Sequence, residues 1–182
     1  MNKTGLMIID IQNIYFEDGD FKLYHPEETS IKARKVLDYF RSNKLPVIHV
    51  QHMFKVNDVS ESEKFRLCEI HKNVMPIEGE TIVVKNFPNS FLKTNLQTCL
   101  EKLEISNLIV VGMMSHMCID TTVRESQNFG YNVIVLEDAC TTKNLKTLNG
   151  EIPASTVHDV FMAALKGTFA QIMTVDEYID AN

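Results

Sequence analysis

Cys118 is the residue of this sequence whose position most favours chemistry. It follows an apolar run, NLIVVGMM at residues 107–114, and opens the segment CIDTTVRESQNFG at residues 118–130, which has the pattern of a helix ended by glycine. At a joint between a buried strand and a helix, partly unpaired N–H groups and the positive end of the helix dipole lower the pKa of a thiol. Because the thiolate is the reactive form, we expect Cys118 to act as a nucleophile.

Two further reactive residues stand at the ends of apolar runs. Asp10 ends the first predicted strand and Lys85 ends the third. Ligands of open α/β sheets bind beyond the carboxyl ends of the strands, so these residues and Cys118 should share one edge. A carboxylate can accept a thiol proton, and an ammonium can stabilise the resulting anion. Each residue alone fits an ordinary turn or surface charge, but the three types together predict a thiol-based active site.

Other chemistries have weaker support in the sequence. No phosphate-binding glycine motif and no G-x-S-x-G nucleophile elbow is present. His49 and His52 lie three apart on a predicted strand, so they should point to opposite faces and not share a metal. Cys68 and His71 offer a pair of ligands without the partners that complete a tetrahedral site. We therefore expect neither a metal nor another cofactor.

Two more histidines require an interpretation. His158 lies in an apolar helical segment, where a hydrogen-bonded structural histidine is the simplest reading. His116 stands two residues before Cys118 and would either pair with the thiol, line a pocket or serve only as a polar loop residue.

Six short apolar segments predict strands that are covered on both faces. They lie at residues 6–10, 46–52, 81–85, 108–112, 133–136 and 171–175. Helical patterns alternate with these segments. The first covers residues 26–43, with Ile31 in its apolar stripe, and the second follows a cap at Asn89 or Ser90. The third follows Cys118, and the fourth covers residues 154–166 before Gly167. This alternation predicts a three-layer, Rossmann-like α/β fold with a mainly parallel six-stranded sheet and helices on both faces.

The totals describe an ordinary globular chain of one domain, residues 1–182. The net charge of -6 disfavours nucleic acid and anionic membranes as partners. Four cysteines without paired spacing, and an N-terminus without a signal-peptide pattern, predict a cytoplasmic protein with free thiols. Residues 53–80 have weak periodicity and mixed charge, and we expect them to pass over the active face or to join a subunit contact.

Three blocks in this order resemble the isochorismatase-like cysteine hydrolases, which include nicotinamidases and N-carbamoylsarcosine amidases. They are DIQNIYF from Asp10, KNFPNSFLKTNL from Lys85, and VVGMMSHMCIDTTVRESQNFGY around Cys118, followed by VLEDACTT. The resemblance covers nearly the whole chain. It implies a triad of Asp10 as base, Lys85, and Cys118 as nucleophile.

The resemblance also implies a cis peptide between Met113 and Met114. In the family, such a bond turns backbone N–H groups toward the substrate carbonyl, so the N–H groups of Met114 and Cys118 would form an oxyanion hole. Gln12, Phe16 and His116 are further candidates for the substrate pocket, Phe16 by offering a ring for stacking.

Two departures narrow the expected reaction. Nicotinamidases of the family bind a divalent metal through a D-x-H pattern after the second strand, whereas this chain continues as VIHVQHMFKVND. True isochorismatases lack the nucleophilic cysteine. The sequence thus predicts a metal-independent hydrolase that cleaves an amide-like C–N bond of a small molecule through a thioester. The resemblance implies a homodimer or homotetramer, because members of the family commonly form dimers and tetramers.

Two alternatives stay open. Cys118 would also suit a redox or peroxide-reactive thiol protein, although no resolving cysteine lies nearby in the sequence. A non-catalytic, ligand-binding member of the same fold is the other alternative, although such a protein has no need of Asp10, Lys85 and Cys118 together.

Overall fold

A parallel sheet of six strands forms the centre of the computed structural model, which describes residues 3–16, 21–54 and 60–182. The strands run in the order β3-β2-β1-β4-β5-β8. Their bounds are β1 (Lys3–Ile9), β2 (Val47–His52), β3 (Thr81–Lys85), β4 (Ile105–Met113), β5 (Asn132–Thr141) and β8 (Gln171–Met173). All six predicted strands are present, and each neighbouring pair is parallel. The predicted fold class is confirmed.

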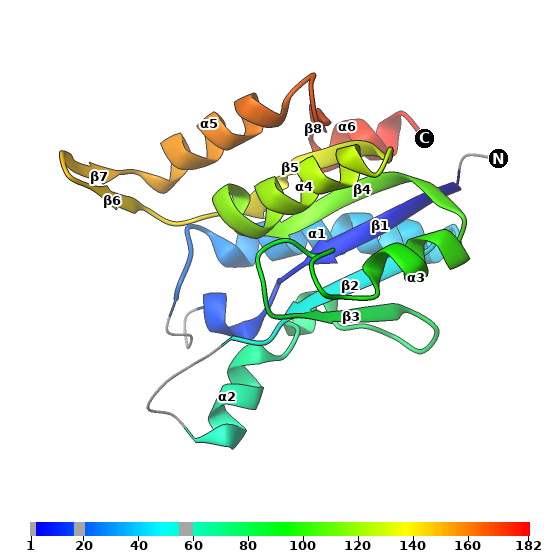
Figure 1. The fold of residues 1–182 in the computed structure, drawn as a ribbon, viewed down its shortest axis with the longest axis horizontal. Coiled ribbons are helices and arrows are strands. Elements are labelled where there is room, and N and C mark those ends of the chain that lie inside the picture. Colours follow the sequence, from blue (N-terminus) through cyan, green and yellow to red (C-terminus); the bar gives the residue numbers. More distant parts are fainter. Residues whose placement is uncertain (1–2, 17–20, 55–59) are drawn as a thin grey trace.

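Helices cover both faces of the sheet (Figure 1). Helix α1 (Pro26–Ser42) and helix α6 (Val175–Asp180) pack on one face, and α3 (Leu96–Lys102), α4 (Asp120–Asn128) and α5 (Ala154–Leu165) belong to the other. The strands supply both cores because their side chains alternate: Leu6 and Ile8 join the first core, and Met7 and Ile9 join the second. Continuous apolar runs are therefore required in the central strands.

Several helix predictions need correction. Neither Asn89 nor Ser90 caps a helix, because α3 begins at Leu96 with Asn95 as its N-terminal flanking residue. Ser90 is instead buried, with its Oγ atom 2.9 Å from Thr122 Oγ1, and this contact ties the segment after β3 to α4. Ile31 was predicted in the apolar stripe of the first helix, but it is 61% exposed because that face of α1 points away from the sheet.

The segment after β2 contains a helix that the sequence pattern did not reveal. Helix α2 (Glu61–Cys68) begins after Ser60, whose side chain accepts a hydrogen bond from the Glu63 N–H. Short 3-10 turns lie at Asn13–Tyr15 and Lys72–Val74. Residues 55–59 of the same segment lie outside the described residues, and a subunit contact there stays a prediction.

Strand β5 is longer than predicted and leads into a hairpin of β6 (Leu145–Thr147) and β7 (Gly150–Ile152). Figure 1 shows this hairpin extending away from the sheet. Its three-residue strands and polar composition left no clear alternation to detect. No helix in the described part of the chain is both long and apolar enough for a transmembrane span.

Gly112 allows β4 to approach β1 where the two strands end. Its φ angle is +135°, and a Cβ atom added there would lie 2.0 Å from the carbonyl oxygen of Ile9. Only glycine fits at this separation and with this dihedral angle. The close approach brings the segment that carries Cys118 beside the residue that follows Ile9, which is Asp10.

Candidate active site

Asp10 and Lys85 form a buried ion pair at the carboxyl edge of the sheet. Oδ2 of Asp10 lies 2.6 Å from Nζ of Lys85, and neither side chain has exposed surface. Asp10 follows β1 with a φ angle of 53°, a left-handed conformation in which the chain turns out of the strand. Apart from this ion pair, neither oxygen of the Asp10 carboxylate has a hydrogen-bond partner among the described residues. The carboxylate therefore keeps acceptor capacity for a proton.

Cys118 lies in a widened helical turn at Ser115–Ile119, directly before α4. The N–H of Ile119 donates to the carbonyl of Met114 over 3.2 Å, which spans five residues instead of the usual four. Such π turns occur frequently at functional sites. The peptide bond between Met113 and Met114 is cis, as the family resemblance implied. Cys118 is 3% exposed, and its sulfur lies within 4.8 Å of a carboxylate oxygen of Asp10.

The pKa of the Cys118 thiol is raised to about 12, contrary to the expected lowering. Burial is the largest cause, and the negative charge of Asp10 adds to it. Lys85 acts in the opposite direction without outweighing these two effects. Burial and the carboxylate of Asp10 thus favour the protonated form of the sulfur in the resting site.

His52 completes this cluster, although sequence reasoning considered it only as a metal ligand and argued against that role. Its Nδ1 atom lies 3.4 Å from Nζ of Lys85 and 3.8 Å from Oδ2 of Asp10. Strand β2 lies between β1 and β3, and His52 is the direct register partner of Lys85. The order of strands would have revealed this contact, but a single sequence does not provide that order. His49 points to the opposite face, as predicted, and its Nε2 atom lies 2.8 Å from Oε2 of Glu80.

Gln12 is buried and uses its amide to hold the backbone around this site. Its Oε1 atom accepts a hydrogen bond from the N–H of His52 over 2.8 Å, while Nε2 donates to the carbonyls of His52 and Cys68. Both amide protons are therefore engaged with the backbone. Contact with a substrate stays a prediction for Gln12, and its observed contacts fix the end of β2.

The observed contacts of Phe16 and His116 are with residues other than Cys118. The ring of Phe16 stacks on His71 with 3.6 Å between centroids. His116 hydrogen-bonds through Nδ1 to the hydroxyl of Thr142, and burial lowers the pKa of its ring. A pairing of His116 with Cys118 therefore has no support in these contacts, and substrate binding by either residue stays a prediction.

Tyr15 is the aromatic residue that sequence reasoning missed. It is buried, and its hydroxyl is close enough to Asp10 and Cys118 for their charges to raise its pKa, although burial is the larger cause. Its ring contacts Phe54 edge-on with 5.6 Å between centroids. Tyr15 adjoins Phe16 in the sequence, and both rings are buried; Phe16 stacks on His71, whereas Tyr15 lies near the charges of Asp10 and Cys118.

The oxygen, nitrogen and sulfur atoms of Asp10, His52 and Cys118 lie within 4.8 Å of one another. Such atoms can ligate a metal in other proteins. Here the ammonium of Lys85 contacts both Asp10 and His52, so a positive charge already occupies the space between them. This positive charge disfavours the binding of a further cation among the three residues.

Two pockets lie near the edges of the sheet, and neither is lined by Asp10, Lys85 or Cys118. One, of about 510 Å³, adjoins the carboxyl edge and is lined by Cys140 and His158, among others. Nδ1 of His158 lies 2.8 Å from the hydroxyl of Ser115, so α5 is hydrogen-bonded to the turn that carries Cys118. This partner confirms the expected structural role of His158.

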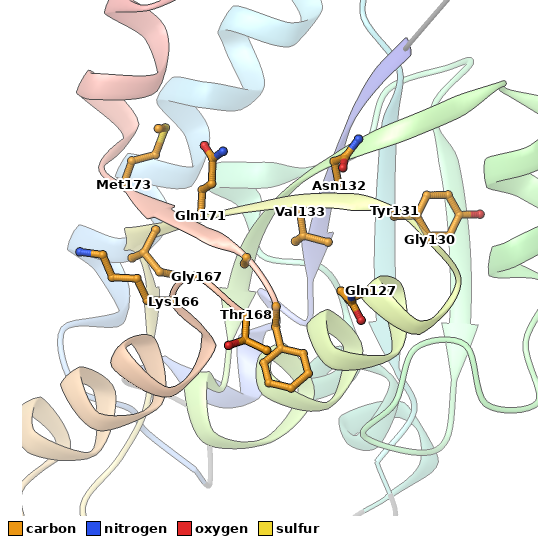
Figure 2. Close-up of a pocket in the computed structure, with 13 residues that line it drawn as sticks. Gln127, Gly130, Tyr131, Asn132, Val133, Lys166, Gly167, Thr168, Gln171 and Met173 are labelled. Carbon is orange, nitrogen blue, oxygen red and sulfur yellow. The ribbon is translucent and has the colours of Figure 1, made fainter.

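The second pocket, of about 590 Å³, lies at the opposite edge of the sheet. Figure 2 shows Asn132 and Val133 at the start of β5 and Gln171 at the start of β8 around it. In parallel strands these are the amino ends, so this pocket is remote from Asp10 and Lys85.

The fold is a three-layer α/β arrangement that gathers Asp10, Lys85 and Cys118 at the carboxyl edge of its parallel sheet. The model of the isochorismatase domain matches residues 4–177, and the chain belongs to the isochorismatase family. The isochorismatase family protein YddQ of Bacillus subtilis strain 168 is 44% identical over 177 residues, which cover 97% of this chain and 98% of that protein.

Two further similarities concern structure and activity. The crystal structure of an isochorismatase hydrolase from Oleispira antarctica is 36% identical, with a TM-score of 0.90, and the match covers 98% of this chain and 97% of that one. Nicotinamidase 3 of Arabidopsis thaliana is 28% identical over 158 residues, which cover 78% of this chain and 74% of that protein. The chain is thus a hydrolase of this family.

Proposed function

We propose that this protein hydrolyses an amide-like C–N bond of a small molecule through a thioester on Cys118. The observation that carries the proposal is the contact of one buried acid, one buried ammonium and one buried thiol at the carboxyl edge of the sheet. Similarity to a nicotinamidase supports C–N cleavage as the reaction class. No feature of the described residues selects a particular amide.

Asp10 is the proposed base and acid. It accepts the proton of Cys118, the thiolate attacks the substrate carbonyl, and the carboxylic acid returns that proton to the leaving nitrogen. Water then attacks the thioester and gives a proton to Asp10, which passes it back to the sulfur as the acid product leaves. Every atom of the reaction is supplied by substrate and one water.

Lys85 makes the first step possible within a buried site. Before proton transfer the site holds Lys85 as a cation, Asp10 as an anion and a neutral thiol; afterwards it holds the same cation, a neutral acid and a thiolate. The net charge of the site is zero in both states, so no unpaired charge is created away from water. The raised pKa of Cys118 fits a thiol that transfers its proton only when a carbonyl is in place.

Backbone N–H groups of Met114 and Cys118 are the proposed oxyanion hole. They belong to the cis peptide and to the π turn, which together change the direction of the chain after β4. A single donor of this kind contributes roughly 3–4 kcal/mol to lowering the barrier.

The remaining proposals concern the cellular location and the oligomeric state of the enzyme. Cytoplasmic location is supported by the four cysteines, which are all free thiols. A homodimer or homotetramer is supported by apolar side chains on the edge strand β3, where Ile82 and Val84 are about half exposed. Sedimentation of the purified chain would test the assembly.

A panel of small amides tests the proposed function. Wild-type protein, Cys118→Ala and the matched control Cys140→Ala are assayed for release of ammonia or amine, with mass spectrometry for a covalent adduct. We expect the control to keep the activity and Cys118→Ala to lose it together with the adduct. Activity that persists in Cys118→Ala would refute the mechanism. A stable sulfenate on Cys118 under mild oxidant, without any amidase activity, would favour the redox alternative.

A further inference from the structure

The ammonium of Lys85 has three protons to donate, and three acceptors contact it in the resting site. Nζ lies 2.6 Å from Oδ2 of Asp10, 3.2 Å from the carbonyl of Pro88 and 3.4 Å from Nδ1 of His52. The sulfur of Cys118 is a potential fourth acceptor, because it lies within 4.8 Å of a carboxylate oxygen of Asp10 and of a ring nitrogen of His52. His52 and Cys118 therefore compete for one proton of Lys85.

Of these three contacts, the one between Lys85 and His52 is the longest and therefore the weakest. The bond to Asp10 is short and joins opposite charges, which makes it the strongest. The carbonyl of Pro88 belongs to the backbone three residues after Lys85 and moves with the chain. The hydrogen bond to His52 is thus the one that Lys85 can exchange for another acceptor at the smallest cost in free energy.

The ring of His52 is held in place from several sides. Gln12 binds both the N–H and the carbonyl of His52, at 2.8 and 2.9 Å. Phe54 stacks on the ring with 4.3 Å between centroids. Since an ammonium only donates, Nδ1 must accept, and the proton of the neutral ring lies on Nε2. A doubly protonated ring would direct an N–H group at Lys85.

We propose that His52 is a positioning residue: it accepts a hydrogen bond from Lys85 in the resting site, and Lys85 gives up this bond in favour of Cys118 when the thiolate forms. In that step the S–H proton moves to Asp10, the hydrogen bond from Lys85 to His52 breaks, and a hydrogen bond from Lys85 to the sulfur replaces it. No electron is transferred, and the charge of the site is unchanged. The inference deepens the proposed function, since it concerns the same proton transfer.

His52 keeps the resting thiol protonated under this proposal. The groups that face it are Asp10 after β1, Lys85 at the end of β3 and Cys118 in the π turn, with Tyr15 near the same charges. If the acceptor at His52 is removed, the third proton of Lys85 can bond to the sulfur both before and after the thiol loses its own proton. The thiolate then forms more readily.

Alkylation of Cys118 by iodoacetamide tests this without any substrate. Rates between pH 7 and 9 are measured by peptide mass spectrometry in wild type, His52→Leu and His52→Asn. Asn keeps an oxygen near the position of Nδ1. We expect His52→Leu to react several-fold faster, where a full pKa unit corresponds to about tenfold, and His52→Asn to react close to the wild-type rate. A His52→Leu rate equal to or below wild type, or equal rates in both variants, would overturn the proposal.

Cys140 serves as an internal control for loosened structure. It is buried on β5, and burial raises the pKa of its thiol to about 12 as well. Faster labelling of Cys118 with unchanged labelling of Cys140 supports the proposal, whereas equal acceleration of both thiols would contradict it.

A second measurement covers the case in which His52→Leu fails to fold. Nitrogen-15 NMR of histidine-labelled wild type, with His52 assigned through His52→Asn, reports which ring nitrogen carries the proton. We expect the Nε2–H tautomer at pH 7.5, and a proton on Nδ1 would overturn the proposal. If the amide panel fails while these results hold, the proposed reaction is wrong and the sharing of the Lys85 proton stands.

Discussion

Nζ of Lys85 lies 2.6 Å from Oδ2 of Asp10, and the two side chains are without exposed surface. Each charge depends on the other, because a lone ion in the protein interior costs several kcal/mol. The pair joins the ends of β1 and β3, with β2 between them. It is therefore both part of the reactive cluster and a link within the sheet.

Replacement of Lys85 by Met should destabilise the protein by roughly 3–5 kcal/mol, because Asp10 is left buried without its counter-ion. Urea denaturation at pH 7 measures the free energy of unfolding. The double variant Asp10→Asn/Lys85→Met removes both charges and should recover part of the loss. Single-variant losses that simply add in the double variant would show that the two charges do not depend on each other.

Replacement of Asp10 by Asn should separate thiol reactivity from catalysis. The negative charge of Asp10 raises the pKa of Cys118, so its removal lowers that pKa and accelerates alkylation of the thiol. Amide hydrolysis should fall by roughly 10²–10⁴-fold, because the proposed base is missing. Parallel measurements of alkylation and amidase rates check this. Slower alkylation in Asp10→Asn would be inconsistent with the electrostatics described.

Replacement of Gly112 by Ala should be among the most damaging small substitutions in the chain. The added Cβ would meet the carbonyl of Ile9 at 2.0 Å, and the φ angle of +135° is unfavourable for alanine. We expect a loss of roughly 4 kcal/mol or a failure to fold. Gly130→Ala is the matched control: φ is +85° there and nothing lies within 4 Å, so a loss of about 1–2 kcal/mol is expected. Thermal unfolding of the two variants provides the comparison, and equal losses would argue against the close contact.

Glu80 should contribute to stability in a defined range of pH. Burial alone would raise its pKa, but hydrogen bonds from Arg41, the N–H of Ile77 and His49 lower it from 4.5 to about 2. A lowered pKa in the folded state means that this stabilisation is complete above pH 4.5 and is lost as the pH falls toward 2. Arg41 contributes two bonds, at 2.8 and 2.9 Å.

Replacement of Arg41 by Met should therefore cost roughly 3 kcal/mol at pH 7. The difference in unfolding free energy between wild type and the variant should shrink between pH 4.5 and 2, as Glu80 becomes neutral. Denaturant titrations across that range measure it. A difference that stays constant from pH 7 to pH 2 would assign the loss to packing instead of charge.

Much of the reactive edge was predictable because strand ends are visible in the sequence. Asp10 and Lys85 each close an apolar run, and Cys118 follows one, so parallel strands place them on the same edge. Helix starts were harder to predict: Leu92 has the spacing of a helical core position in the sequence, yet it is 46% exposed and precedes α3. The spacing of apolar residues does not reveal that a turn occupies several residues before the helix begins.

The sequence by itself determined that Cys118 has an acid and a cation within the same edge, because residue type and the strand pattern suffice for that. Only the tertiary structure decided the electrostatics of the site and its fourth member. Burial raises the pKa of Cys118 instead of lowering it, and burial depends on packing from distant elements. His52 lies beside Lys85 because β2 pairs with β3 and separates it from β1, an order of strands that arises from the whole sheet at once.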